Sequence, residues 1–154
     1  MAIERARAYL KKFDLDQRVV EFPVSSATVE LAAEAAGVIP ARIAKSLSFM
    51  TADGPVLVVT AGDMKIDNPK YKAQFHCKAK MLSRDEVAAL IGHDVGGVCP
   101  FGVEPGVRTY LDVSMRRFDT VFPACGSANS AIELTCDELE RAAQSFAGWI
   151  DVCK

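Results

Sequence analysis

The sequence lacks any long hydrophobic run. Its most apolar stretch, VLVVTA at 56–61, is far shorter than the roughly 20 residues that a membrane-spanning helix needs. The N-terminal segment, MAIERARAYLKKF, mixes charged and apolar residues and lacks the apolar segment and small-residue cleavage site of a signal peptide. These absences predict a cytoplasmic protein that does not contact a membrane.

Cysteine pairs and cofactor motifs are also missing. The five cysteines lie far apart with no CxxC pair, which argues against a disulfide framework and a structural zinc site. Asp63 and Asp67 have no third ligand beside them, and Lys65 between them favours salt bridges over a metal site. No Walker loop occurs, and no GxGxxG motif follows a predicted strand. We therefore expect neither a metal nor a nucleotide cofactor.

Neither sign of charge dominates the chain. There are 18 Lys and Arg residues and 20 Asp and Glu residues, a formal net charge of -2, so the composition does not indicate binding to DNA. The charge is uneven, however, with six basic and two acidic residues between 63 and 84. This local excess indicates either an ordinary solvated surface or a patch that meets phosphates.

With 154 residues, half of them hydrophobic, the chain suits a single domain over 1–154 with a buried core. Helical spacing predicts helices at 2–13, 25–37, 68–75, 83–92 and 135–146. Ser26 or Thr28 is the expected N-cap of the second helix. Apolar and alternating runs predict strands at 18–22, 44–51, 55–62, 108–114, 120–124, 131–135 and 149–153. Strands in neighbouring runs favour an α+β fold around a mixed, curved sheet.

Lys45 is the first candidate for a functional side chain. It lies at the start of a predicted strand and shares a face with Leu47 and Phe49, because strand side chains alternate. Such a lysine either extends its ammonium to solvent or lies partly buried beside a pocket. In a pocket, the ammonium could hold an ester carbonyl, a carboxylate or a phosphate.

The stretch GGVCPFG at 96–102 is the second candidate. Gly96 and Gly97 either direct successive backbone N–H groups at a developing oxyanion or simply form a tight turn. A second stretch of small residues, ACGSANS at 124–130, would share one cleft with the first if the fold brings the two together.

Five stretches together resemble one known family. ATVELAAEAAGV, ARIAKSLSF, PVLVVTAGDMKIDNPKYK, GGVCPFG and ACGSANSAIELT match the order and spacing of the YbaK/EbsC family. That family consists of editing domains related to an insertion in bacterial prolyl-tRNA synthetases. The resemblance covers about residues 20–150. It implies a mixed sheet, partly closed like a barrel and flanked by helices.

The resemblance also implies a function. Members of the family hydrolyse the ester that joins a wrong amino acid to a tRNA, especially tRNA for proline. Such an ester is already activated, so positioning and modest charge stabilisation suffice, without a cofactor. The implied partners are the acceptor end of an aminoacyl-tRNA and, as a further candidate, prolyl-tRNA synthetase.

The family's functional positions can be carried onto this sequence. The implied catalytic groups are Lys45, Gly96 and Gly97. The implied substrate-binding residues are Thr28, Cys99, Pro100, Phe101, Gly102, Gly126, Ser127 and Asn129. The side chains that would grip the acceptor stem are Lys65, Lys70, Lys72, Lys78 and Lys80.

One stretch departs from the family pattern. Several members that remove cysteine carry a basic, glycine-containing stretch and then an acidic residue after the last glycine. Here the stretch is SANSA, with Ser127 and Asn129 as its polar groups and Ala131 near the position of the acid. The resemblance therefore implies removal of a small amino acid such as Cys, Ala or Ser, without selecting one.

Two other functions stay open at this point. A non-catalytic module for a small amino acid or an aminoacyl-RNA end would show saturable binding without turnover. Cys99 with His93 or His76 would make a cysteine hydrolase, although their spacing matches no known motif.

Overall fold

A six-stranded mixed sheet forms the centre of the structure, a computed structural model that describes residues 2–154. Its strand order is β7-β5-β2-β3-β4-β8, and β1 and β6 form a separate two-stranded sheet. The strands are β1 (Val20–Glu21), β2 (Ile43–Thr51), β3 (Gly54–Ala61), β4 (Arg108–Asp112), β5 (Thr120–Pro123), β6 (Ser130–Ala131), β7 (Leu134–Thr135) and β8 (Phe146–Ile150). The α-helices are α1 (Ala2–Lys11), α2 (Val29–Ala36), α3 (Asn68–Phe75), α4 (Arg84–Glu86) and α5 (Cys136–Ala142).

The longest strands, β2 and β3, form an antiparallel hairpin. Ala44 pairs with Ala61 at one end of the hairpin and Thr51 pairs with Gly54 at the other, so residues 52 and 53 make the turn. β5 joins the outer edge of β2 in parallel, and β4 joins the outer edge of β3 in parallel. This combination gives the mixed, curved sheet of an α+β domain, which confirms the predicted fold class.

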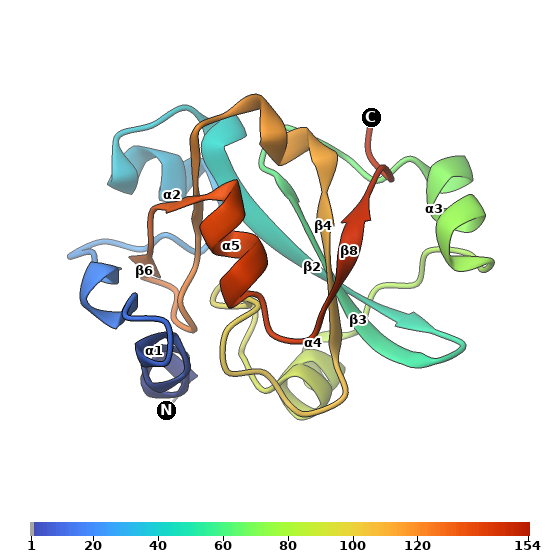
Figure 1. Cartoon of the computed structure of the whole chain (residues 1–154), viewed down its shortest axis with the longest axis horizontal. Coiled ribbons are helices and arrows are strands. Elements are labelled where there is room, and N and C mark those ends of the chain that lie inside the picture. Colours follow the sequence, from blue (N-terminus) through green and yellow to red (C-terminus); the bar gives the residue numbers. More distant parts are fainter. Residues whose placement is uncertain (1) are drawn as a thin grey trace.

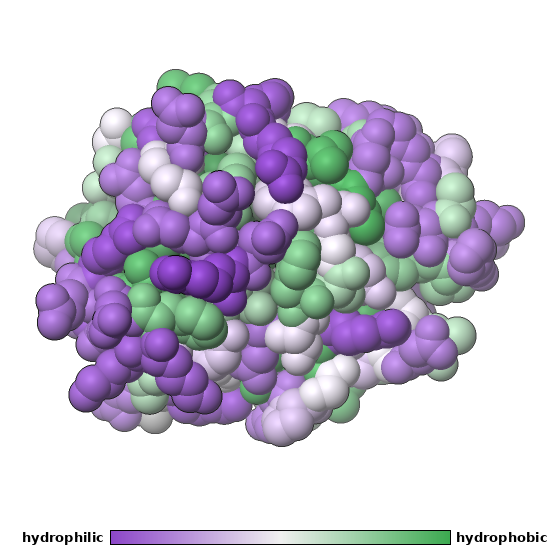
Figure 2. All heavy atoms as spheres, viewed as in Figure 1, coloured by the Kyte–Doolittle hydropathy of each residue, from purple (hydrophilic) through white to green (hydrophobic). Residues whose placement is uncertain are grey.

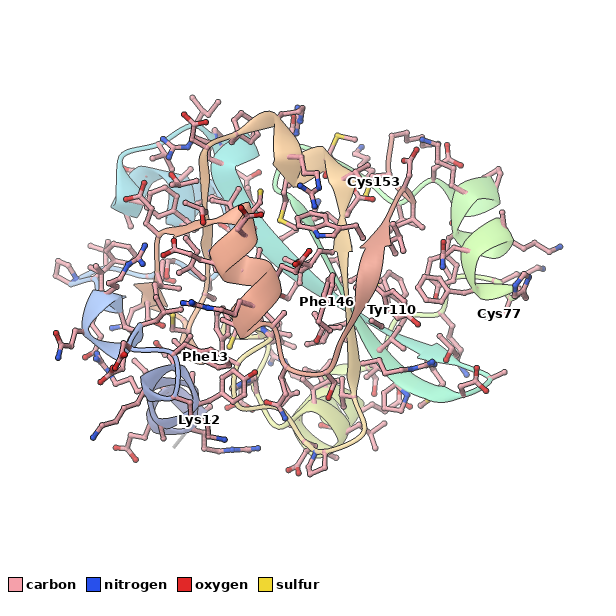
Figure 3. The ribbon with its side chains drawn as sticks, viewed as in Figure 1. Lys12, Phe13, Cys77, Tyr110, Phe146 and Cys153 are labelled. Atoms are coloured by element: carbon pink, nitrogen blue, oxygen red, sulfur yellow. The ribbon has the colours of Figure 1, made fainter. Side chains whose placement is uncertain are left out.

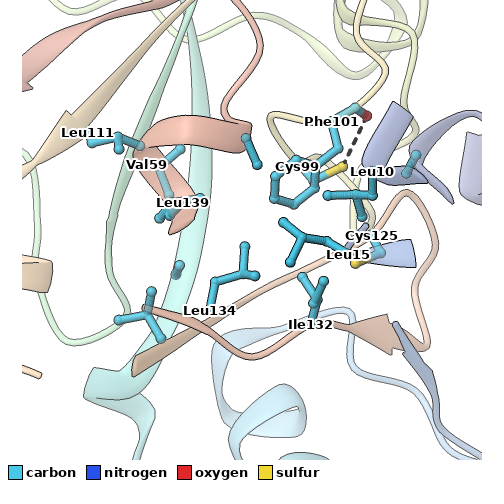
Figure 4. Close-up of a cluster of buried hydrophobic side chains, with 14 of the residues drawn as sticks. Leu10, Leu15, Val59, Cys99, Phe101, Leu111, Cys125, Ile132, Leu134 and Leu139 are labelled. Atoms are coloured by element: carbon cyan, nitrogen blue, oxygen red, sulfur yellow. Dashed lines mark hydrogen bonds between the residues drawn. The ribbon is translucent and has the colours of Figure 1, made fainter. Parts of the chain in front are cut away.

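Helices cover the sheet and create its buried core. In Figure 1, α5 lies across the front of the sheet, α1 and α4 lie below it, and α3 lies at the far right beyond β8. The largest apolar cluster joins α1 and α5 to the sheet, with Leu10, Leu111 and Leu139 fully buried (Figure 4). A second cluster around Phe49 and Tyr71 fixes α3 to the sheet. Burial of each such side chain stabilises the fold by roughly 1.5–3 kcal/mol.

The helix ends follow local sequence signals. Thr28, not Ser26, caps α2, because its side chain accepts a hydrogen bond from the Leu31 N–H. Complete capping boxes open α4, between Ser83 and Glu86, and α5, between Thr135 and Glu138. These ends are fixed locally, which is why the helix starts were predictable.

The C-terminal third differs from the prediction. The stretch predicted as one strand at 131–135 is two short strands, because β6 pairs with β1 whereas β7 pairs with β5. α5 ends at Ala142, short of the predicted 146, because the Gln144 side chain bonds the Val103 backbone through both its amide atoms at 2.9 Å. β8 therefore starts at Phe146, three residues before the predicted strand.

Hydrophobic residues do not gather into one large area on the face in Figure 2, where hydrophilic side chains separate them. Within residues 2–154, each helix is too short or too polar to cross a bilayer.

Candidate active site

The pocket that Lys45 lines, called the main pocket below, lies along the open edge of β2. It has a volume of about 270 Å³ and is lined by residues of α2, β2, the glycine-rich loop, β5 and β6. β5 pairs with β2 only at Ile43 and Ala44. Further along the same edge, the Met50 N–H donates to the Lys80 carbonyl at 2.9 Å, and the Leu82 N–H donates to the Ser48 carbonyl at 3.1 Å. Residues 45–47 between these two stretches have no strand partner on this edge within the described chain, and the pocket occupies that gap.

Lys45 lies in this gap and lines the pocket, half-buried. It pairs with Thr60 across the hairpin, and its Nζ donates a hydrogen bond to the Met64 carbonyl. An ammonium has three donors, so this bond leaves two for a ligand. Of the two alternatives that the sequence left open for Lys45, the structure shows the partly buried lysine beside a pocket.

A bidentate ion pair supports the turn that holds Lys45. Arg117 donates to both carboxylate oxygens of Asp63, at 2.7 and 3.1 Å, next to Met64. The Arg117 hydrogen bond is the main cause that lowers the pKa of Asp63, and the charge of Lys45 adds a smaller effect. Asp67 instead caps α3 by accepting from the Lys70 N–H. Both carboxylates thus have structural roles, and the described residues include no cluster of three or more His, Cys, Asp or Glu suited to a metal.

The glycine-rich loop contributes one of its two expected glycines. Gly96 lines the same pocket as Lys45, with a left-handed φ of 98° and little room for a side chain beside Ala27. Gly97 does not line the pocket, and its N–H donates to the Asp94 carbonyl at 3.0 Å. The expectation of two successive N–H groups directed at a substrate is wrong for Gly97, because this turn already uses its donor.

The two small-residue loops lie against each other, as the cleft hypothesis requires. The Gly126 N–H donates to the Gly97 carbonyl at 3.0 Å, and a Cβ on Gly97 would lie 2.6 Å from the Ser127 nitrogen. Gly97, Gly126 and Ser127 line a neighbouring hollow of about 370 Å³. Val95 borders both this hollow and the main pocket.

The polar groups of the second loop stabilise the loop itself. Ser127 Oγ lies within hydrogen-bond distance of Asn129 Oδ1, at 2.9 Å, and of Ser130 Oγ, at 2.7 Å, and its single proton serves one of them. Asn129 Nδ2 donates to the Phe22 carbonyl at 3.2 Å. Neither Ser127 nor Asn129 lines the main pocket; Ser130 and Ala131, which follow them, do.

The other loop residues predicted to bind substrate lie behind the pocket wall. Cys99, Pro100 and Phe101 are buried, and Phe101 stacks on Tyr9 of α1 with the ring centroids 6.5 Å apart. Gly102 lies against the backbone of Arg5, where a side chain would clash. None of these four residues lines the main pocket.

The burial of Cys99 contradicts the hypothesis of a cysteine hydrolase. Its side chain lies in the core beside Leu10 and Phe101 (Figure 4), with Sγ 3.5 Å from His93 Nε2. Burial raises the pKa of the thiol to about 12, so the thiolate nucleophile is absent near neutral pH. His76, the other candidate base, is exposed at the end of α3.

Sequence reasoning missed several pocket residues. Ser26, Ser46 and Ser48 line the pocket, as do Met81 and Phe122. The available signal was weak: Ser46 and Ser48 follow Lys45 on the same strand, but their side chains alternate with that of Lys45.

The predicted lysine patch lies around α3. Lys65, Lys72, Lys78 and Lys80 are exposed, and Lys72 and Lys78 flank a hollow of about 510 Å³. Lys70 is instead engaged with Asp151 and the Cys153 carbonyl, each at 3.0 Å. Lys80 directly precedes Met81, so the basic segment leads to the pocket wall.

The curved mixed sheet and the lysine-lined pocket at its edge define an α+β domain of the aminoacyl-tRNA editing class. The chain matches the model of the aminoacyl-tRNA editing domain over residues 24–142, and it belongs to this family.

Two known proteins are similar to this chain in sequence. The uncharacterized protein YwhH of Bacillus subtilis (strain 168) is 54% identical over 155 residues, covering 100% of this chain and 98% of YwhH. The proline–tRNA ligase of Thermotoga sp. (strain RQ2) is 33% identical over 90 residues, which are 58% of this chain and 15% of the ligase.

Solved structures share the fold over nearly its full length. A protein crystallised as a candidate trans-editing enzyme for prolyl tRNA synthetase has a TM-score of 0.87 and 27% identity, covering 99% of this chain and 97% of its own. Hypothetical protein APE2540 has a TM-score of 0.85 and 25% identity, covering 97% of this chain and 99% of its own.

Proposed function

We propose that this protein is a trans-editing hydrolase that deacylates mischarged tRNA in the cytoplasm. The substrate would be tRNA for proline that carries a small wrong amino acid such as Cys, Ala or Ser. The observation that carries this proposal is that Lys45 and the bare main chain of Gly96 line the same pocket of about 270 Å³. Membership of the editing family supports it, and so does the similarity to a ligase for proline.

Hydrolysis of an aminoacyl ester needs few groups from the protein, because the ester is already activated. In the net reaction a water oxygen bonds to the ester carbonyl carbon, the bond from that carbon to the ribose oxygen breaks, the ribose oxygen takes a proton from the water, and the free amino acid leaves. The two remaining Lys45 donors would hold the carbonyl oxygen or the terminal phosphate, while Gly96 allows the ester to approach the main chain. A pocket that fits the wrong amino acid and is too small for the correct one would give double-sieve editing.

The exposed lysines give the proposed partner a place to bind. Lys72, Lys78 and Lys80 lie on the segment that leads to Met81 at the pocket. Cations there would attract the phosphates of the acceptor stem without reading its bases. Prolyl-tRNA synthetase is the proposed source of the mischarged tRNA, since the candidate trans-editing structure was described for that enzyme.

The test is deacylation of a panel of mischarged tRNAs by the wild type and by Lys45→Ala. We expect release of a small amino acid from at least one tRNA, with kcat/KM lowered about 100-fold or more in Lys45→Ala, because a main polar contact to the ester is lost. Lys11→Ala, at the exposed end of α1, is the matched control and should keep the wild-type rate. A fully active Lys45→Ala would refute the proposal, and saturable binding without turnover would identify a binding module instead.

A further inference from the structure

A short turn that follows β3 holds the Lys45 ammonium. Within residues 2–154 this ammonium makes one hydrogen bond, to the Met64 carbonyl. The Met64 N–H closes the turn by donating to the Ala61 carbonyl at 3.1 Å. Because a lysine side chain is flexible, the position that the turn gives to the Met64 carbonyl decides where the ammonium lies.

Arg117 supports this turn from one side. Its guanidinium donates to both carboxylate oxygens of Asp63, and its Nε donates to the Ser114 carbonyl at 2.8 Å. Ser114 Oγ accepts from the Ala61 N–H at 3.2 Å. Two residues of the turn, Ala61 and Asp63, are thus bonded to the 3-10 helix Val113–Arg117. The paired bonds to the carboxylate fix its direction as well as its distance, because the guanidinium is planar.

The C-terminal segment supports the chain on the other side of Met64. Lys65 and Lys154 exchange backbone hydrogen bonds at 3.1 and 2.9 Å, and the Asp67 N–H donates to the Val152 carbonyl at 2.8 Å. The backbone that follows Met64 is therefore paired with residues 152–154.

One buried carboxylate joins the two supports. Asp112, at the end of β4, is only 1% exposed. Its Oδ2 accepts from the Ser114 N–H at 3.0 Å, and its Oδ1 accepts from the Val152 N–H at 2.9 Å. A buried carboxylate needs such donors, so these bonds keep both supports in fixed places. The Met64 carbonyl is held between two parts of one connected network.

We propose that Asp63 and Arg117 are positioning residues for deacylation, which place the Lys45 ammonium at the ester by fixing the Met64 carbonyl. This inference rests on the proposed deacylase function. Neither Asp63 nor Arg117 lines the main pocket, so each acts through Lys45 and not on the substrate. A misplacement of about 1 Å can slow a reaction about 100-fold, so a partial loss of this support should lower kcat measurably.

The experiment is a double-mutant cycle between Asp63 and Lys45. kcat and KM are measured for the wild type, Asp63→Asn, Lys45→Ala and the double variant, with the mischarged tRNA that the wild type deacylates fastest. Asp63→Asn keeps the size of the side chain but replaces one acceptor oxygen with a donor. We expect it to lower kcat about tenfold with KM within about twofold, and to change kcat less than about twofold in the Lys45→Ala background.

Arg117→Gln tests the other member of the pair. It should lower kcat as much as Asp63→Asn does, and the two changes together should slow the reaction no more than either alone, because they break one interaction. Exposed ion pairs contribute little to stability, so the Tm of each variant should stay within a few degrees of the wild-type value. Rates are measured well below Tm, so that they report folded protein.

Glu21→Gln is the matched control. Glu21 pairs with Arg7 at 2.7 Å, the same distance as the shorter bond between Arg117 and Asp63, and both pairs are partly exposed. Glu21 lies in β1 and does not line the main pocket. This variant should keep the wild-type kcat and KM.

The remaining outcomes each refute one claim. A wild-type kcat for Asp63→Asn, or equal slowing in the wild-type and Lys45→Ala backgrounds, would overturn the positioning role. A Glu21→Gln variant as slow as Asp63→Asn would do the same, because the effect would then follow from any lost surface charge. If none of the aminoacyl-tRNAs in the panel is deacylated, the proposed function itself fails.

Discussion

Single residues decide which chemistry this protein can perform. Cys99 lies within the glycine-rich loop at 96–102, and a thiol near a histidine suggests a nucleophile. The structure buries that thiol completely and raises its pKa to about 12. Lys45, by contrast, is half-buried and lines a pocket, and its ammonium makes one hydrogen bond within residues 2–154, to the Met64 carbonyl. Cys99 and Lys45 differ in burial and in their hydrogen-bond partners, and the residue type alone reveals neither.

We predict that thiol-specific reagents will distinguish the five free cysteines. Cys77 and Cys136 are partly exposed, whereas Cys99, Cys125 and Cys153 are buried. Cys77 lies at the end of α3 and Cys153 near the end of β8, on separate parts of the chain (Figure 3). Native protein treated with iodoacetamide and mapped by mass spectrometry should be labelled mainly at Cys77 and Cys136.

Denatured protein should be labelled at all five cysteines, which is the control for reactivity. Rapid labelling of Cys99 in the native protein would show an accessible thiolate, and it would reopen the hypothesis of a cysteine hydrolase.

At the scale of elements, the glycine-rich loop and the 124–130 loop act as one unit. Their contact depends on Gly97, where a Cβ would lie 2.6 Å from the Ser127 nitrogen and 2.7 Å from the Gly126 carbonyl carbon. The backbone at Gly97 is not left-handed, so close approach alone explains the need for glycine. Close packing of Gly97 against Gly126 and Ser127 holds the loop in place, and the neighbouring Gly96 lines the pocket.

Gly97→Ala should therefore separate the loops. We expect the free energy of unfolding to fall by about 1–3 kcal/mol, as in overpacked sites, and kcat/KM for deacylation to fall with it. Urea titration and the deacylation assay measure the two effects.

Gly106→Ala is the control for this prediction. Gly106 has a left-handed φ of 89° but open space around its Cβ position, so only backbone strain is added, and activity should be kept. If Gly97→Ala matches the wild type in both assays, the two loops are not in close contact.

The stability of the whole molecule should depend on pH in two separate ranges. Burial lowers the pKa of His93 below its ordinary value of 6.5, and nearby Arg5 lowers it further, against the opposing effects of the Phe101 carbonyl and Asp94. As pH falls through 6.5, the unfolded chain binds a proton that the folded chain resists, so stability decreases. Glu138 affects stability at lower pH. The hydrogen bond from Arg18 lowers its pKa to about 2, so its contribution to stability is fully present above about pH 4.5 and is lost as the pH falls below that value.

His93→Gln should flatten the first of these ranges. Wild-type stability is expected to fall by at most about 1.4 kcal/mol per pH unit between about pH 6.5 and 5.5 from this residue, whereas the variant should lose little. Urea unfolding at a series of pH values measures the slope. His76→Asn, at the exposed and left-handed C-cap of α3, should retain the wild-type slope. Identical slopes for His93→Gln and the wild type would contradict this account.

The sequence determined the features that depend on local chemistry. Capping boxes set the starts of α4 and α5, the apolar runs around the turn set β2 and β3, and the ordered motifs predicted the family and Lys45. Such signals act within a few residues, so they can be recognised without knowing what lies nearby in space.

Only the tertiary structure decided which residues meet at the pocket. Gln144 ends α5 by bonding a distant backbone, and the strand at 131–135 divides between two sheets. Ser26 and Ser46 stay unpaired because segments 20 residues apart enclose them beside a gap in the edge of β2. Burial and the presence of a partner are properties of the packed chain, and this is why the candidate site was predictable at Lys45 and not at these serines.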